Sequence, residues 1–68
     1  MDYYKLMAGL INWGNSPMYQ GWRLHHFRDK GNIERYWASK AYESIPKGYI
    51  ATYLHLDRLL KRIDEIQG

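Results

Sequence analysis

The side chains with the most obvious chemistry are rings and cations in the middle of the chain. Residues 19–40 read YQGWRLHHFRDKGNIERYWASK, so aromatic and basic residues alternate on both sides of Asp29-Lys30-Gly31-Asn32. Rings and guanidinium groups on one strand face can stack on nucleic-acid bases, and the same residue types form the energetic centre of protein interfaces. The residues predicted to bind a partner are Arg23, His25, Phe27, Arg28, Lys30 and Tyr36.

The histidines are the candidate metal ligands. His25 and His26 are adjacent, and adjacent side chains on a strand point to opposite faces, so the pair cannot hold one ion without a bulge. His55 lies far away in the sequence, and the chain has no cysteine to assist. We therefore expect no metal and no other cofactor.

Asp64 and Glu65 are the candidates for acid–base catalysis, which requires carboxyl groups that converge in a pocket. They fall on the polar side of a predicted helix, where solvation and pairing along the helix explain them. The sequence shows no serine–histidine–aspartate set, phosphate loop or nucleophile elbow. A chain of 68 residues also has little volume with which to enclose a ligand. We expect no enzyme activity and no catalytic residue.

The aromatic and basic stretch has the pattern of an antiparallel β-hairpin. If Lys30-Gly31 form the centre of the turn, His25 pairs with Tyr36 and Leu24 pairs with Trp37. The face predicted to join the core then carries Trp22, Leu24, Ile33 and Trp37, with His26 and Arg35 toward its rim. The opposite face carries Arg23, His25, Phe27, Glu34, Tyr36 and Ala38. A slip of one residue in one strand would exchange that strand's faces.

Two helices are predicted to flank this hairpin. Asp2 is a good N-cap for a helix over Tyr3–Trp13, which Gly14-Asn15-Ser16-Pro17 would end. The clearest helical spacing belongs to the apolar residues Leu56, Leu59, Leu60, Ile63 and Ile66. Thr52 is a candidate N-cap for this second helix, and Tyr49–Ala51 are expected to form a turn before it.

The connection Ala41–Gly48 contains Pro46 and Gly48 and has room for a third short strand at Tyr42–Ile45. No repeat, linker or low-complexity tract divides the chain. We expect a single α+β domain over residues 1–68, of order αββα, with the hairpin packed on the C-terminal amphipathic helix.

Composition limits the location and the class of partner. The formal net charge is +3, and the whole excess lies in Tyr19–Gly48. No stretch is long and apolar enough for a membrane span or resembles a signal peptide, so we expect a cytoplasmic protein without a membrane partner. Three Trp, seven Tyr and one Phe exceed what one small core can bury, which favours a binding surface and self-association into a homo-oligomer.

The layout of a hairpin with a lysine–glycine turn and a final helix reading YLHLDRLLKRIDEI resembles small uncharacterised hairpin-plus-helix proteins encoded by phages and plasmids. The resemblance covers Gly21–Ile66. It implies an accessory protein that binds a host or defence component, with no catalytic residues to carry over.

Three functions remain open from the sequence. The first is a non-enzymatic interaction protein, an adaptor or inhibitor that binds and occludes a host or defence protein. The second is a small nucleic-acid-binding regulator that uses the same aromatic and basic face, and the third is a structural subunit of a larger complex. Glu34 within that face, with Asp29 and Glu43 near its ends, would dilute the attraction for phosphates and favours a protein partner. The alternative for the rings is burial against the N-terminal helix.

Overall fold

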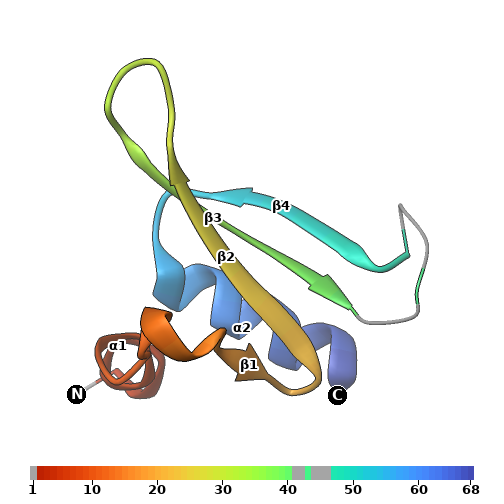
Figure 1. Cartoon of the computed structure of the whole chain (residues 1–68). Coiled ribbons are helices and arrows are strands. Elements are labelled where there is room, and N and C mark those ends of the chain that lie inside the picture. Colours follow the sequence, from red (N-terminus) through yellow and green to blue (C-terminus); the bar gives the residue numbers. More distant parts are fainter. Residues whose placement is uncertain (1, 41–42, 44–46) are drawn as a thin grey trace.

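The computed structural model describes residues 2–40, 43 and 47–68. Within this part of the chain, four strands follow one α-helix in the sequence and precede another (Figure 1). The elements are α1 (Tyr3–Gly9), the short 3-10 helix η1 (Trp13–Asn15), β1 (Met18–Tyr19), β2 (Trp22–Arg28), β3 (Glu34–Lys40), β4 (Tyr49–Tyr53) and α2 (Leu56–Gln67). The strands form one antiparallel sheet in the order β1-β2-β3-β4, and α2 packs against it. The predicted α+β class, with a hairpin on a C-terminal helix, is confirmed.

Helix α2 supplies one side of the core. Its periodic apolar residues Leu59, Leu60 and Ile63 are fully buried, because a stripe at this spacing turns to one side of the helix. The buried residues of the core as a whole are Tyr19, Trp22, Leu24, Ala38, Ile50, Leu56, Leu59, Leu60 and Ile63. The predicted N-cap at Thr52 is wrong, because that residue lies in β4 and the helix starts at Leu56.

Helix α1 packs against α2, on the same side of the sheet (Figure 1). Asp2 caps it as predicted, since its carboxylate accepts a hydrogen bond from the Tyr4 N–H at 2.9 Å. The helix ends at Gly9 instead of Trp13, and Trp13–Asn15 form a separate turn whose N-cap is Asn12. The side chains of α1 and its following loop that pack on the core are Tyr4, Met7, Ala8, Ile11 and Trp13. Neither α1 nor α2, the two α-helices of the described residues, therefore covers the other face of the sheet.

The register predicted for the hairpin is wrong by one residue. Leu24 pairs with Ala38 and His26 pairs with Tyr36. The cause is a loop with three residues at its centre, in which the Asn32 N–H donates to the Asp29 carbonyl at 2.9 Å and Asn32 takes the left-handed conformation at φ 61°. Strand β2 keeps its predicted faces, whereas those of β3 are exchanged: Tyr36 and Ala38 turn toward α2, and Arg35 and Trp37 turn away.

Two strands that the hairpin pattern did not predict complete the sheet. Gln20-Gly21 have positive φ values of 53° and 86°, which is the geometry of a tight two-residue hairpin turn that pairs β1 with β2. On the other side, β4 pairs with β3, and a bulge lets both Ile50 and Tyr53 pack toward the core. The strand expected at Tyr42–Ile45 lies outside the described residues except for Glu43, which is in no strand.

Candidate binding surface

The sheet face turned away from both helices is the candidate binding surface, and we call it the outer sheet face. The strand register defines its members: Met18↔Arg23↔Ser39↔Tyr49 lie side by side across the four strands, followed by His25↔Trp37 and Phe27↔Arg35. Figure 1 shows α1 and α2 together on the opposite side of the sheet. The rings of the outer sheet face are therefore not covered by the N-terminal helix.

A row of three rings crosses the middle of this face. The rings of His25 and Trp37 stack with centroids 3.9 Å apart and planes 14° apart, and the ring of Tyr49 lies 5.3 Å from that of Trp37. His25 Nε2 also shares a hydrogen bond with Ser39 Oγ at 2.9 Å. Burial, together with the nearby Arg23, lowers the pKa of His25, so this ring is neutral at neutral pH. The row is thus a fixed and uncharged aromatic surface.

Cations and further apolar side chains surround the row. Arg23 is exposed, and Arg35 donates from Nε to Asp29 Oδ2 at 2.6 Å. The hydrogen bond from Arg35 is the main reason that the pKa of Asp29 lies below its usual value. Phe27 and Met18, at opposite ends of the face, keep 42% and 50% of their surfaces exposed. Apolar rings beside a free guanidinium group are the composition of a protein-binding surface.

Three of the six residues predicted to bind a partner lie together as expected, since Arg23, His25 and Phe27 all belong to the outer sheet face. Lys30 is exposed in the hairpin loop. Arg28 lies at the end of β2 on the other face, with its Nε 3.3 Å from Glu34 Oε2. The two other rings of the face, Trp37 and Tyr49, were not predicted there, and the register explains the omission of Trp37.

Tyr36 and Glu34 are corrections to the predicted face. Both turn to the helix side of the sheet, because the three-residue loop exchanges the faces of β3. The ring of Tyr36 stacks with that of Trp13 at 6.0 Å, and Glu34 Oε1 lies 2.5 Å from His26 Nδ1. The predicted dilution of positive charge by Glu34 on the binding face is therefore wrong.

The histidines do not converge. His25 stacks on Trp37 on the outer sheet face, whereas His26 lies 4.3 Å from the ring of Trp13 on the helix side. The two side chains point to opposite faces, as their adjacency on a strand predicted. Among the described residues, no cluster of three or more His, Cys, Asp or Glu side chains could hold a metal ion.

Asp64 has a structural role that the sequence did not indicate. Its Oδ2 accepts hydrogen bonds from the hydroxyls of Tyr4 at 2.8 Å and Tyr19 at 2.9 Å, and Gln20 Nε2 approaches Oδ1 at 3.4 Å. The hydrogen bond to Asp64 raises the pKa of Tyr4, and burial followed by the same hydrogen bond raises that of Tyr19. The cluster thus joins α1, β1 and α2 through one carboxylate.

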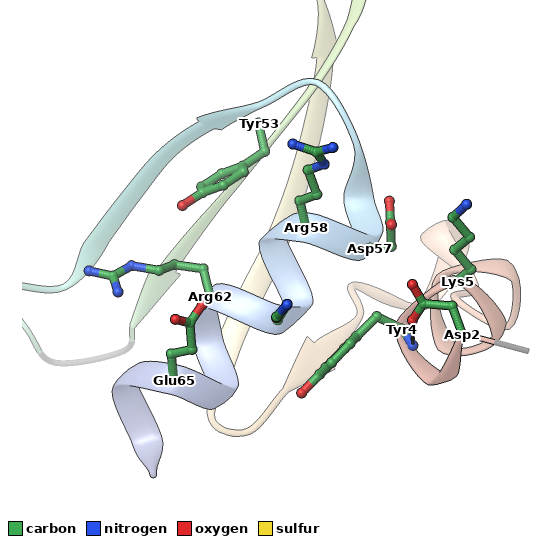
Figure 2. Close-up of a pocket in the computed structure, with 9 residues that line it drawn as sticks. Asp2, Tyr4, Lys5, Tyr53, Asp57, Arg58, Arg62 and Glu65 are labelled. Atoms are coloured by element: carbon green, nitrogen blue, oxygen red, sulfur yellow. Dashed lines mark hydrogen bonds between the residues drawn. The ribbon is translucent and has the colours of Figure 1, made fainter.

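A groove of about 540 Å³ lies between α1, α2 and Tyr53 (Figure 2). Its lining residues are Asp2, Tyr4, Lys5, Tyr53, Asp57, Arg58, Lys61, Arg62 and Glu65. Figure 2 shows basic and acidic side chains interleaved around it. Opposite charges so close together select neither an anion nor a cation, and the groove is not our candidate site.

Comparison of the chain with protein-family models, with curated proteins and with solved structures finds no match. The fold and the surface thus define a small α+β protein with one open aromatic sheet face. Within residues 2–40, 43 and 47–68, neither helix has the length and apolar character needed to cross a membrane.

Proposed function

We propose that the protein is a non-enzymatic interaction protein that occludes a partner protein with its outer sheet face. The observation that carries this proposal is the uncovered row of His25, Trp37 and Tyr49. Large rings that are already fixed by stacking lose little conformational freedom on binding, and rings next to arginine are the usual hot spots of protein interfaces.

The charges on the outer sheet face favour a protein over a nucleic acid. Arg35 is held by Asp29, so Arg23 is the one arginine of this face, among the described residues, without a carboxylate partner. A nucleic-acid binder gains most of its affinity from several phosphate contacts, each made by a cation. The apolar Met18 and Phe27 at the ends of the row suit a protein surface better than a phosphate backbone.

A nucleic-acid-binding regulator is the second candidate, and the position of Glu34 supports it. With Glu34 on the helix side, the described part of the outer sheet face holds no carboxylate except Asp29 at its end, which Arg35 neutralises. Bases could stack on Trp37 and Phe27 next to Arg23. Binding through several phosphates would weaken by orders of magnitude between low and moderate salt, whereas binding of a protein through rings would change much less.

The resemblance to proteins of phages and plasmids guides the choice of partner. It supports an accessory or inhibitor protein that acts in the cytoplasm on a host or defence protein. The exposed rings would also be buried if the chain formed a homo-oligomer or were a structural subunit of a larger complex. Mass measurement on the isolated chain distinguishes the homo-oligomer from the monomer.

Affinity capture with the intact chain tests the proposal. We expect the wild-type chain to retain one protein partner after nuclease treatment, and the double variant Trp37→Ala with Phe27→Ala to lose it. Tyr3→Ala is the matched control, because Tyr3 is an exposed ring on α1, away from the sheet. Equal capture by the double variant and the wild type would contradict the outer sheet face as the binding surface. Capture that disappears with nuclease or moderate salt would favour the nucleic-acid candidate.

A further inference from the structure

Strand β4 forms one edge of the sheet, and among the described residues nothing pairs with its free side. The Lys40 N–H donates to the Gly48 carbonyl at 2.9 Å, and Tyr49 and Ile50 continue the same register along β3. Because hydrogen-bonded and non-hydrogen-bonded pairs alternate in an antiparallel ladder, the backbone N–H and C=O groups of Tyr49 point away from β3, up to the bulge that follows Ile50. These groups are available to pair with another strand.

The sequence of β4 does nothing to block such pairing. Tyr49–Tyr53 read YIATY, with no charge and no proline. Proteins commonly protect edge strands with lysine, proline or a very short strand. The opposite edge has such protection, since β1 contains two residues and follows Pro17. An open β4 is therefore a distinctive feature of this sheet.

A groove of about 370 Å³ lies beside this edge, between β4 and the C-terminal half of α2. Its lining includes Ile50 and Tyr53 from the strand and Arg62 and Ile66 from the helix. Figure 2 shows Tyr53 projecting from β4 toward α2 and Arg62 reaching from α2 toward the strand. A strand added to β4 would direct every second side chain toward this groove, because side chains alternate across a sheet.

The charge of the groove identifies the kind of strand. Lys47 and Arg62 are the charged residues among its described lining, and both are basic. A second copy of the chain would bring the same two cations to the edge, whereas a carboxylate would find two partners there. The partner that complements the groove is thus an extended segment with an acidic side chain between apolar ones.

We propose that β4 and α2 form a peptide-binding site in which an acidic extended segment of a partner protein adds to the sheet as a further strand. Main-chain hydrogen bonds to Tyr49 supply affinity, and the groove selects side chains: a carboxylate beside Lys47 and Arg62, and an apolar group against Ile66. The site is separate from the outer sheet face. A peptide bound there would enlarge the contact that a partner protein makes with the outer sheet face.

A fluorescence-anisotropy titration tests this site directly. The probe is a short labelled peptide of alternating valine and glutamate, and its control has lysine in place of glutamate. We expect saturable binding of the glutamate peptide with a dissociation constant below about 1 mM and no binding of the lysine peptide. Arg62→Gln should weaken binding about tenfold, since a charge-assisted hydrogen bond is lost. Arg58→Gln, an exposed arginine one turn earlier that does not line this groove, should leave binding unchanged.

A methylated form of the probe tests the main-chain contribution. The glutamate peptide with N-methyl groups on two successive central residues keeps its side chains but lacks the N–H groups that an added strand donates, so we expect its binding to be lost. The proposal would be overturned by equal binding of the glutamate and lysine peptides, by equal effects of the two arginine variants, or by equal binding of the methylated and unmethylated glutamate peptides. Loss of partner capture in Trp37→Ala with peptide binding intact would show that the two surfaces act separately.

Discussion

Tyr19 donates its hydroxyl to the carboxylate of Asp64 over 2.9 Å, which fastens β1 to the C-terminal half of α2. Tyr4 donates to the same oxygen over 2.8 Å and adds α1 to the same point. Forty-five residues separate Tyr19 from Asp64 along the chain. A single carboxylate therefore holds three elements together.

Replacing Asp64 should destabilise the fold. We expect Asp64→Ala to lower the free energy of unfolding by about 2 kcal/mol, because two hydrogen bonds to a charged group disappear and the hydroxyl of buried Tyr19 loses its acceptor. Urea unfolding of the variant and the wild type measures this difference. The control is Glu65→Ala, which removes the neighbouring exposed carboxylate. Equal effects of the two substitutions would show that Asp64 is merely another surface charge.

Stability should also fall in alkaline solution because of Tyr19. Burial and the hydrogen bond to Asp64 raise its pKa in the folded state, whereas the unfolded chain releases this proton near pH 10. Above that pH the unfolded state binds fewer protons than the folded state, so the free energy of unfolding decreases as the pH rises toward the folded-state pKa. Denaturant midpoints between pH 8 and about 11 should fall less steeply for Tyr19→Phe than for the wild type. Tyr49→Phe, which removes the hydroxyl of an exposed tyrosine on the outer sheet face, should keep the wild-type slope.

Local sequence patterns were sufficient to predict the class of fold and the assignment of the β2 side chains to the two faces of the sheet. The apolar spacing in Leu56–Gln67 determines both a helix and its buried side, and alternation alone places Trp22 and Leu24 on one face of β2. The same alternation correctly groups Arg23, His25 and Phe27 on the other face. These predictions depend on neighbours within one element, which is why they hold.

The register of the hairpin depends on a choice that residue types do not decide. Lys30-Gly31 suit a two-residue turn, but Asp29 accepts hydrogen bonds from the N–H groups of Gly31 and Ile33, and Asn32 tolerates the left-handed conformation. Both registers also bury an aromatic residue of β3. The sequence gives no strong preference between burying Tyr36 and burying Trp37, so the faces of that strand could not be assigned from it.

The remainder of the candidate surface and the Asp64 cluster depend on tertiary contacts. Tyr49 joins the ring row only because β4 pairs with β3, whereas the local sequence predicts a turn before a helix at Tyr49–Ala51. Asp64 and Glu65 have the same residue character and adjacent positions on a helix. Only the packing of α1 and β1 around α2 distinguishes the carboxylate that accepts two hydroxyls from the one that faces solvent.

The corrected register leads to opposite effects for two rings that the sequence placed together. We expect Tyr36→Ala to lower the melting temperature by about 5 °C or more, since it removes a ring packed on Trp13 and the core. Phe27→Ala should leave the melting temperature within about 2 °C of the wild type and act on partner capture instead. Thermal melts of the two single variants provide the test. A large loss of stability in Phe27→Ala would mean that the outer sheet face is covered in the protein.

Leu60 should be among the most sensitive positions of the core. Its side chain is fully buried in the middle of the α2 stripe, so Leu60→Ala removes transfer free energy and leaves a cavity, at a cost of about 2–5 kcal/mol. That cost is comparable with the whole stability of a small domain. Ile66→Ala, at the partly exposed end of the same stripe, is the control and should cost much less. Chemical unfolding that ranks the two variants equally would contradict the observed orientation of α2.

Self-association is expected at high protein concentration, and α1 presents the surface for it. Tyr3 and Leu6 lie on its side away from the core and Leu10 is its C-cap, and Leu6 and Leu10 keep 51% and 70% of their surfaces exposed. These residues follow helical spacing and form an apolar stripe that an isolated chain leaves in water. We expect sedimentation velocity to show a monomer–dimer equilibrium at high micromolar concentration, and the double variant Leu6→Lys with Leu10→Lys to remain monomeric. Leu54→Lys, at an equally exposed leucine outside the helices, should still form the dimer. A wild-type chain that stays monomeric throughout the concentration range would show that this stripe does not pair with its own copy.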